Sequence, residues 1–103
     1  MTSDKRQQLP IGSVVNILED NITVVIIGQF PVVETEFGKG YFDFVGAIPP
    51  IGFDPKNNIF FNKEDINGVV FLGYVDIEFQ NFIEKAEEFE KTTPLEKLET
   101  QKK

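Results

Sequence analysis

The chain has 103 residues and a formal net charge of -7, and it contains no cysteine, histidine or tryptophan. A chain of this length forms one domain, and its 41% hydrophobic content suffices for a folded core. Without cysteine there can be no disulfides, thiolate zinc sites or cysteine nucleophiles. Without histidine, the commonest general acid–base and the commonest metal ligand are also missing.

The charge balance limits the classes of partner. Seventeen acidic residues against ten basic ones repel phosphate backbones and anionic lipids, and Arg6 is the single arginine in the chain. We therefore expect no nucleic-acid partner and no membrane partner. The longest purely apolar stretch, residues 24–27, is far shorter than the roughly 20 residues of a membrane span, and no apolar leader follows the polar start. These features predict a soluble cytoplasmic protein.

The first half of the chain reads as two hairpins. Residues 13–18 and 22–27 are rich in valine and isoleucine and flank a Glu-Asp-Asn turn. The second strand is apolar on both faces, apart from one threonine, and this predicts a central position in a sheet. A second hairpin is predicted from residues 32–37 and 41–45 around a Gly-Lys-Gly loop at residues 38–40.

The second half is predicted to hold two short strands and a helix. The strands cover residues 59–61 and 69–72. Between them, Asn62 is expected to cap one helical turn, and Asp65 is the third residue after it, as in a capping box. The helix begins after the N-cap residue Asp76 and ends at residues 92–94. Its apolar face follows helical spacing and consists of Phe79, Phe82, Ile83, Ala86 and Phe89.

These elements predict an α+β fold. About five antiparallel strands form a small SH3-like, partly open barrel, packed by the C-terminal helix, and a single twisted sheet is the alternative. The predicted organisation is a flexible segment over residues 1–8, one domain over residues 9–91 and a polar, frayed tail over residues 92–103.

Two segments resemble known binding motifs, but neither matches its motif in full. Residues 54–65 begin and end like a calcium loop, but Lys56 replaces a ligand and Ile59 replaces the glycine of the sharp turn. The Gly-Lys-Gly loop is followed by a strand, whereas a phosphate loop opens a helix. We therefore expect no cofactor, no metal site and no catalytic residue. An enzyme that uses only carboxylates is the least favoured function.

Two features instead point to protein binding. Of the eleven phenylalanines, six are expected in the core: Phe42, Phe44, Phe60, Phe71, Phe79 and Phe82. Exposed apolar loops often mark contact sites, and one candidate loop consists of Ile48, Pro49, Pro50, Ile51 and Phe53. The alternative is that this loop folds back as a lid over the barrel end. An acidic stripe on the helix is either a docking surface for a basic partner or a solvated face, and it includes Glu84, Glu87 and Glu88.

Four segments in order resemble a known family. They are residues 9–15 (LPIGSVV), 41–46 (YFDFVG), 60–66 (FFNKEDI) and 70–74 (VFLGY). Together they resemble a small family of unknown function from Gram-positive bacteria, whose members are often encoded in type VII (ESX-like, WXG100/LXG) secretion loci. The resemblance covers about residues 9–90 and implies a gene neighbourhood, not a chemistry.

That neighbourhood implies two roles. The first is a non-enzymatic accessory or chaperone-like protein that binds a type VII secretion substrate, such as a helical WXG100- or LXG-type protein. The second is an immunity protein that neutralises a cognate toxin. An acidic surface suits both roles, because it steers association with basic partners.

Overall fold

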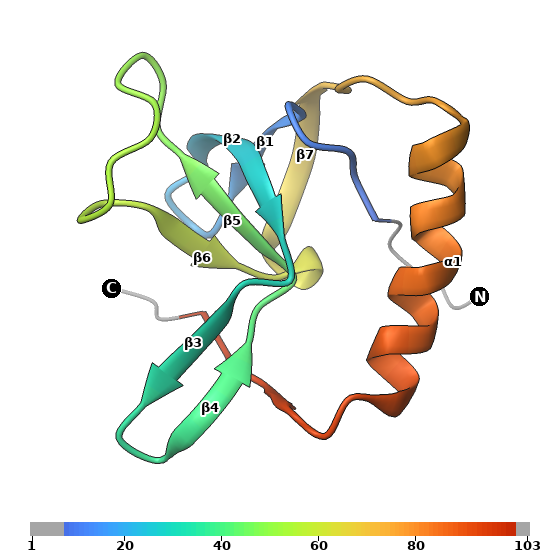
Figure 1. The fold of residues 1–103 in the computed structure, drawn as a ribbon. Helices are drawn as coiled ribbons and strands as arrows, with labels where there is room; N and C mark the ends of the chain where they lie inside the picture. Colours follow the sequence, from blue (N-terminus) through green and yellow to red (C-terminus); the bar gives the residue numbers. More distant parts are fainter. Residues whose placement is uncertain (1–7, 101–103) are drawn as a thin grey trace.

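The computed structural model describes residues 8–100 of the chain (Figure 1). It contains one α-helix, one short 3-10 helix and eight strands. In chain order they are β1 (Val14–Ile17), β2 (Ile22–Gln29), β3 (Val32–Thr35), β4 (Gly38–Tyr41), β5 (Phe44–Ala47), β6 (Ile59–Phe61), η1 (Lys63–Asp65), β7 (Ile66–Phe71), α1 (Ile77–Thr92) and β8 (Glu96–Lys97).

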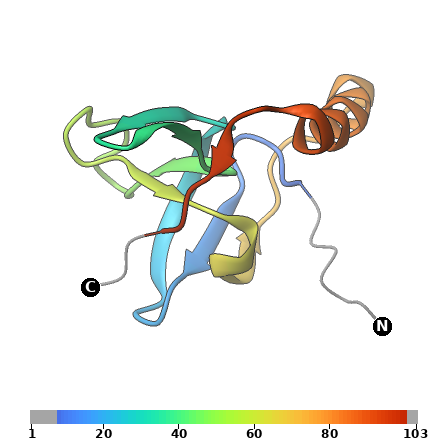
Figure 2. The same cartoon turned by 90° about the horizontal axis from the view of Figure 1, so that it is seen from below.

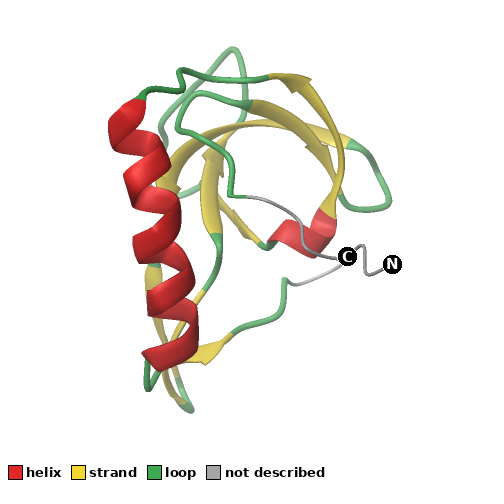
Figure 3. Ribbon diagram, turned by 90° about the vertical axis from the view of Figure 1, so that its right-hand side faces the viewer, coloured by secondary structure: helices red, strands yellow, loops and turns green. Residues whose placement is uncertain are grey.

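Five strands form one strongly curved sheet in the order β6-β5-β2-β1-β7, and all neighbours in it are antiparallel. Figure 3 shows these strands bending around a common centre. The sheet is not closed, because β6 and β7 are its two edges. The expected α+β class is confirmed, and the open, curved sheet is compatible with both a partly open barrel and a twisted sheet. Strand β2 has the predicted central position.

The core lies inside this curved sheet. It consists of six side chains with no exposed surface, and all of them point inward from strands: Val15, Ile17, Val24, Ile26, Phe44 and Phe61. Val15 and Ile17 alternate with half-buried neighbours along β1, as the two-residue period of a strand requires. Two of the six phenylalanines expected in the core, Phe42 and Phe44, are buried, while Phe60, Phe79 and Phe82 are half-buried.

A second sheet has the order β3-β4-β8 and extends away from the barrel (Figure 1). Here the predicted hairpin is wrong in register. The turn lies at residues 36–37, and residues 38–40 belong to β4, which pairs Gly38 with Thr35. The predicted second arm is also divided. It leaves β4 at Tyr41 and continues at Phe44 as β5 in the other sheet. With this division and the unpredicted strand β8, the described residues form eight strands where about five were predicted.

Helix α1 lies at one side of the strands (Figure 2). The Asp76 carboxylate accepts a hydrogen bond from the Phe79 N–H at 2.9 Å, so the predicted N-cap is confirmed. The apolar face of the helix packs mainly through aromatic rings. The ring centroid of Phe89 lies 4.8 Å from that of Phe30 and 5.3 Å from that of Tyr41. No helix within residues 8–100 combines the length and the apolar character that a membrane crossing requires.

The segment after the helix differs from the expected frayed tail. Glu96–Lys97 forms β8, parallel to β4, and the Leu98 N–H donates to the Tyr41 carbonyl at 2.8 Å. Residues 101–103 lie outside the described residues, as do residues 1–7 of the expected flexible N-terminal segment. The eighth residue of that segment, Gln8, is buried and donates to the Gln29 side chain at 2.5 Å.

Candidate protein-docking surface

The largest exposed apolar feature is the end of β7 and the linker to α1. Seven of the nine residues from 69 to 77 are large apolar residues that are 42–78% exposed. We call them the apolar run: Val69, Val70, Phe71, Leu72, Tyr74, Val75 and Ile77. Isolated exposed apolar residues are ordinary, but a continuous series of this kind marks a contact surface.

The position of β7 in the sheet explains this exposure. The strand pairs with β1 on one side and forms an edge of the sheet on the other. Its register slips twice. Val14 lies opposite Phe71 while Val15 lies opposite Val69, so Val70 is an extra, bulged residue. Phe71 shares the outer face of the sheet with Val14 and is 60% exposed, so its predicted place in the core was wrong.

At Gly73, the linker that carries the apolar run lies against the N-terminal segment of the chain. The Gly73 N–H donates to the Ser13 hydroxyl at 2.9 Å, and a Cβ at this position would lie only 2.5 Å from the Ile11 carbonyl oxygen. This close backbone contact holds the linker against the N-terminal segment. Ile11 is itself about half exposed, and it adds an eighth apolar side chain to the surface.

The size of the surface suits a protein interface. A fully exposed large apolar side chain presents about 200 Å². At their observed exposures, the apolar run and Ile11 therefore present on the order of 900 Å². A stable interface buries about 800 Å² on each partner, so the apolar area of the run and Ile11 is of the same order.

The segments that form and adjoin the apolar run lack basic residues over long stretches. The chain contains no lysine or arginine between residues 8 and 38 or between residues 64 and 84. These two ranges include β1, β2, β7, the linker and the first half of α1. Asp20 lies in the turn next to the start of β7, where the Asn67 side chain donates to Asn21 at 2.7 Å. Glu78, in the first turn of α1, follows the other end of the run. Both ends are thus acidic.

The predicted apolar loop is exposed and does not fold back as a lid. Ile51 is 73% exposed and Phe53 is 68% exposed, while Ile48, Pro49 and Pro50 are also exposed. The loop turns back on itself through a hydrogen bond of 2.9 Å from the Gly52 N–H to the Ile48 carbonyl. Figure 1 shows it on the side of the barrel away from α1.

The acidic stripe is exposed as well. Glu84, Glu87 and Glu88 lie on the outer face of α1, whereas Glu90 in the next turn forms an ion pair of 2.9 Å with Lys63. The loop and helix α1 lie on opposite sides of the barrel in Figure 1, so the fold does not combine these two predicted sites into one. The apolar run was missed because a strand that is apolar on both faces is typical of a buried position.

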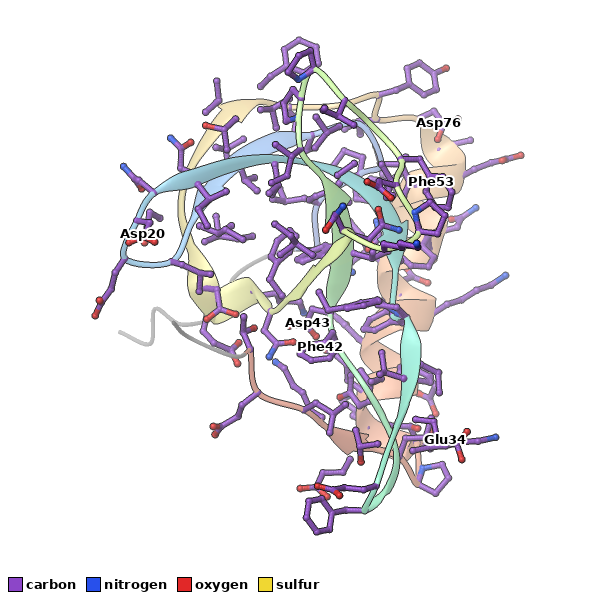
Figure 4. The ribbon with its side chains drawn as sticks, turned by 90° about the vertical axis from the view of Figure 1, so that its left-hand side faces the viewer. Asp20, Glu34, Phe42, Asp43, Phe53 and Asp76 are labelled. Carbon is purple, nitrogen blue, oxygen red and sulfur yellow. The ribbon has the colours of Figure 1, made fainter. Side chains whose placement is uncertain are left out.

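A buried polar cluster is the second feature that sequence reasoning missed. The Asp43 side chain is fully buried, and one carboxylate oxygen accepts from the Lys63 N–H and from Lys97 Nζ, both at 2.9 Å. Lys97 also contacts Glu64 at 3.1 Å. Figure 4 shows Asp43 within the body of the molecule and Asp20 at the outer tip of its turn.

Burial and pairing act against each other in this cluster. Burial by itself lowers the pKa of Lys97, but the hydrogen bonds and charges of Asp43 and Glu64 outweigh it and raise that pKa. Burial likewise raises the pKa of Glu64, and its backbone hydrogen bond together with Lys97 reverses the sign, so the pKa is lowered. Both groups are therefore held in their charged forms, as in a structural ion pair.

The remaining contacts of the cluster attach residues 98–100 to the barrel. Asn62 Nδ2 donates to the Leu98 carbonyl at 2.8 Å, and the Thr100 hydroxyl donates to the Asp65 carboxylate. Asp65 also accepts from the Asn62 N–H at 2.9 Å, as the predicted capping box requires, but the Asn62 side-chain oxygen accepts from the Asp43 N–H instead. Across residues 8–100 there is no group of three acidic side chains that could hold a metal ion.

Comparison with known proteins gives one match. No curated protein and no solved structure matches the chain. The model of a family described as a domain of unknown function, DUF4176, matches residues 8–82, which is more than half of the chain and includes the whole apolar run. The chain therefore belongs to the DUF4176 family of domains of unknown function.

Proposed function

We propose that this chain is a non-enzymatic protein-binding module and that the apolar run is its docking surface. The observation that carries the proposal is the exposure of seven large apolar side chains within nine consecutive residues at a sheet edge. Leaving so much apolar surface in water is unfavourable, by roughly 25 cal/mol for each Å². A partner that covers the run removes that cost.

Within this role, we propose that the chain is an accessory or chaperone-like protein for a type VII secretion substrate. Two features support this finer role: the resemblance of its four sequence segments to a family encoded in such loci, and the fit between an apolar groove or edge and the apolar stripe of a helical protein. The partner is then a WXG100- or LXG-type protein encoded near this chain.

Co-expression with each such neighbour tests the proposal. We expect one neighbour to elute with the chain as a stoichiometric complex in size-exclusion chromatography with light scattering. The double variant Val70→Asp/Tyr74→Asp places two charges in the apolar run and is expected to abolish the complex. The matched control is Phe37→Asp, because Phe37 is an apolar residue that is 92% exposed at the distant β3–β4 turn.

The result also separates the accessory role from the immunity role. A complex with the helical part of the substrate supports the accessory role. Binding to the toxic domain, together with rescue of cells that express that domain, would instead indicate immunity. If no neighbour binds, or if the double variant binds as well as the wild-type chain, the proposed docking function is wrong.

A further inference from the structure

We infer that the apolar run binds an amphipathic helix whose apolar stripe is bordered by lysine or arginine. This inference rests on the proposed function and adds the chemistry of the partner. Three observations support it: the slipped register of β7, the distribution of charge around the run, and the length of the run.

The slipped register opposes binding by strand addition. An edge strand recruits another strand when its free backbone groups follow one regular ladder, and bulges disrupt that ladder. β7 contains two extra residues relative to β1, Asn67 and Val70. Its side chains Val69, Val70 and Phe71 are nevertheless half or more exposed. A partner therefore gains more from packing on these side chains than from extending the sheet.

The charge distribution selects the partner's charge. Asp20 lies in the turn next to the start of β7, Glu78 follows the other end of the run, and no lysine or arginine occurs in β1, β2, β7, the linker or the first half of α1. The run itself is uncharged apart from the capping residue Asp76. Two copies that met through this surface would bring acidic ends together, and an anionic lipid surface would be repelled for the same reason. A basic border on the partner complements both ends.

The length of the run sets the size of the helix. Nine residues of fully extended chain span at most about 30 Å. The run is shorter than this, because only residues 69–71 belong to β7, the linker bends toward α1 (Figure 1) and Ile77 is already helical. A helix rises 1.5 Å per residue, so about 20 residues, or five to six turns, are enough to cover the run. Over that length an amphipathic helix presents one apolar stripe, and its bordering positions come close to both acidic ends.

Designed peptides can test this inference directly. The probe is a 20-residue amphipathic helix with leucines on one face and lysines at the bordering positions, and its matched control carries glutamates at those positions. We expect the lysine-bordered peptide to bind the full chain at least tenfold more tightly at low salt. The difference should shrink at high salt, because exposed charges are screened.

Variants distinguish docking on the run from general attraction to an acidic protein. Val70→Asp/Tyr74→Asp adds negative charge and yet is expected to weaken binding of the lysine-bordered peptide at least tenfold. Asp20→Asn/Glu78→Gln should remove most of the preference for lysine borders. The control Glu87→Gln/Glu88→Gln removes the same charge from the exposed acidic stripe of α1 and should change binding less than twofold.

Three results would overturn the inference. They are equal binding of both peptides, unchanged binding to Val70→Asp/Tyr74→Asp, and a stable dimer of the chain that this double variant dissociates. If the peptides fail while a co-expressed neighbour still binds through the apolar run, the helix with basic borders is wrong and the proposed function stands. If the neighbour also fails to bind, the proposed function is wrong as well.

Discussion

Lys97 is half-buried and connects Asp43, Glu64 and strand β4. Its ammonium group contacts the fully buried Asp43 and the exposed Glu64, and its own strand β8 pairs with β4. A buried carboxylate without its counter-charge is costly, because the interior solvates charge poorly. The ion pair therefore adds to the backbone and side-chain hydrogen bonds that hold residues 96–100 against the barrel.

Removing the ammonium group should strongly destabilise the fold. We expect Lys97→Met to lower the free energy of unfolding by about 3 kcal/mol, because Asp43 is left charged and buried. Urea denaturation followed by circular dichroism measures the change. The double variant Asp43→Asn/Lys97→Met should recover part of the loss. A loss below about 0.5 kcal/mol, as for an exposed pair, would contradict the buried pairing.

The same residues predict how stability changes at high pH. Burial, together with the negative charge of Asp43, raises the pKa of Tyr41, and pairing raises the pKa of Lys97. The folded chain thus keeps protons that the unfolded chain releases above about pH 10. Stability from both groups is complete below that pH and should fall as the pH rises above it. Thermal melts at each pH measure this, and Tyr41→Phe should show a smaller fall. A flat profile would contradict the account.

At the scale of elements, the sequence predicted those features that depend on residues close together in the chain. The helix start at Asp76 and the strand at residues 59–61 follow from capping and from side-chain type, and the structure has both. The prediction of a loop at residues 38–40 was wrong. Gly40 is a glycine because it packs closely against a segment that is distant in the sequence, and not because it forms a turn. A Cβ there would lie 2.6 Å from the Leu98 side chain and 2.7 Å from the Glu96 carbonyl. No local pattern reveals that contact.

The exposure of β7 likewise depends on contacts between residues that are distant in the sequence. Its apolar sequence is typical of a buried strand, and only the order of strands in the sheet places it at an edge. The candidate loop at residues 48–53 could be identified from its prolines and apolar residues, since short loops lie at the surface. The apolar run could not, because strand order depends on contacts between distant residues.

Edge position predicts a contrast in stability between two phenylalanines. Phe44→Ala should lower the free energy of unfolding by about 3–5 kcal/mol, because Phe44 is fully buried in the core. Phe71→Ala should cost less than about 1.5 kcal/mol in the isolated chain, because Phe71 is 60% exposed. Urea denaturation of both variants checks this contrast. Equal costs would mean that Phe71 is covered in the free protein.

At the scale of the whole molecule, the residues that stabilise the fold are separate from the exposed apolar run. The inside of the curved sheet holds the core, and the Asp43 cluster fastens the C-terminal residues, so neither is available to a partner. The apolar run lies outside both and is surrounded by acidic and neutral residues. A protein built in this way can bind through its edge while its core stays unchanged.

Hydrogen–deuterium exchange of the chain, with and without its co-expressed partner, tests this account most directly. Backbone amides become protected where a partner covers them. We expect protection on binding to centre on residues 69–77 and to include Ile11, while residues 48–53 and the middle of α1 exchange as in the free chain. Protection confined to residues 48–53 or to the acidic stripe of α1, with residues 69–77 unchanged, would contradict it.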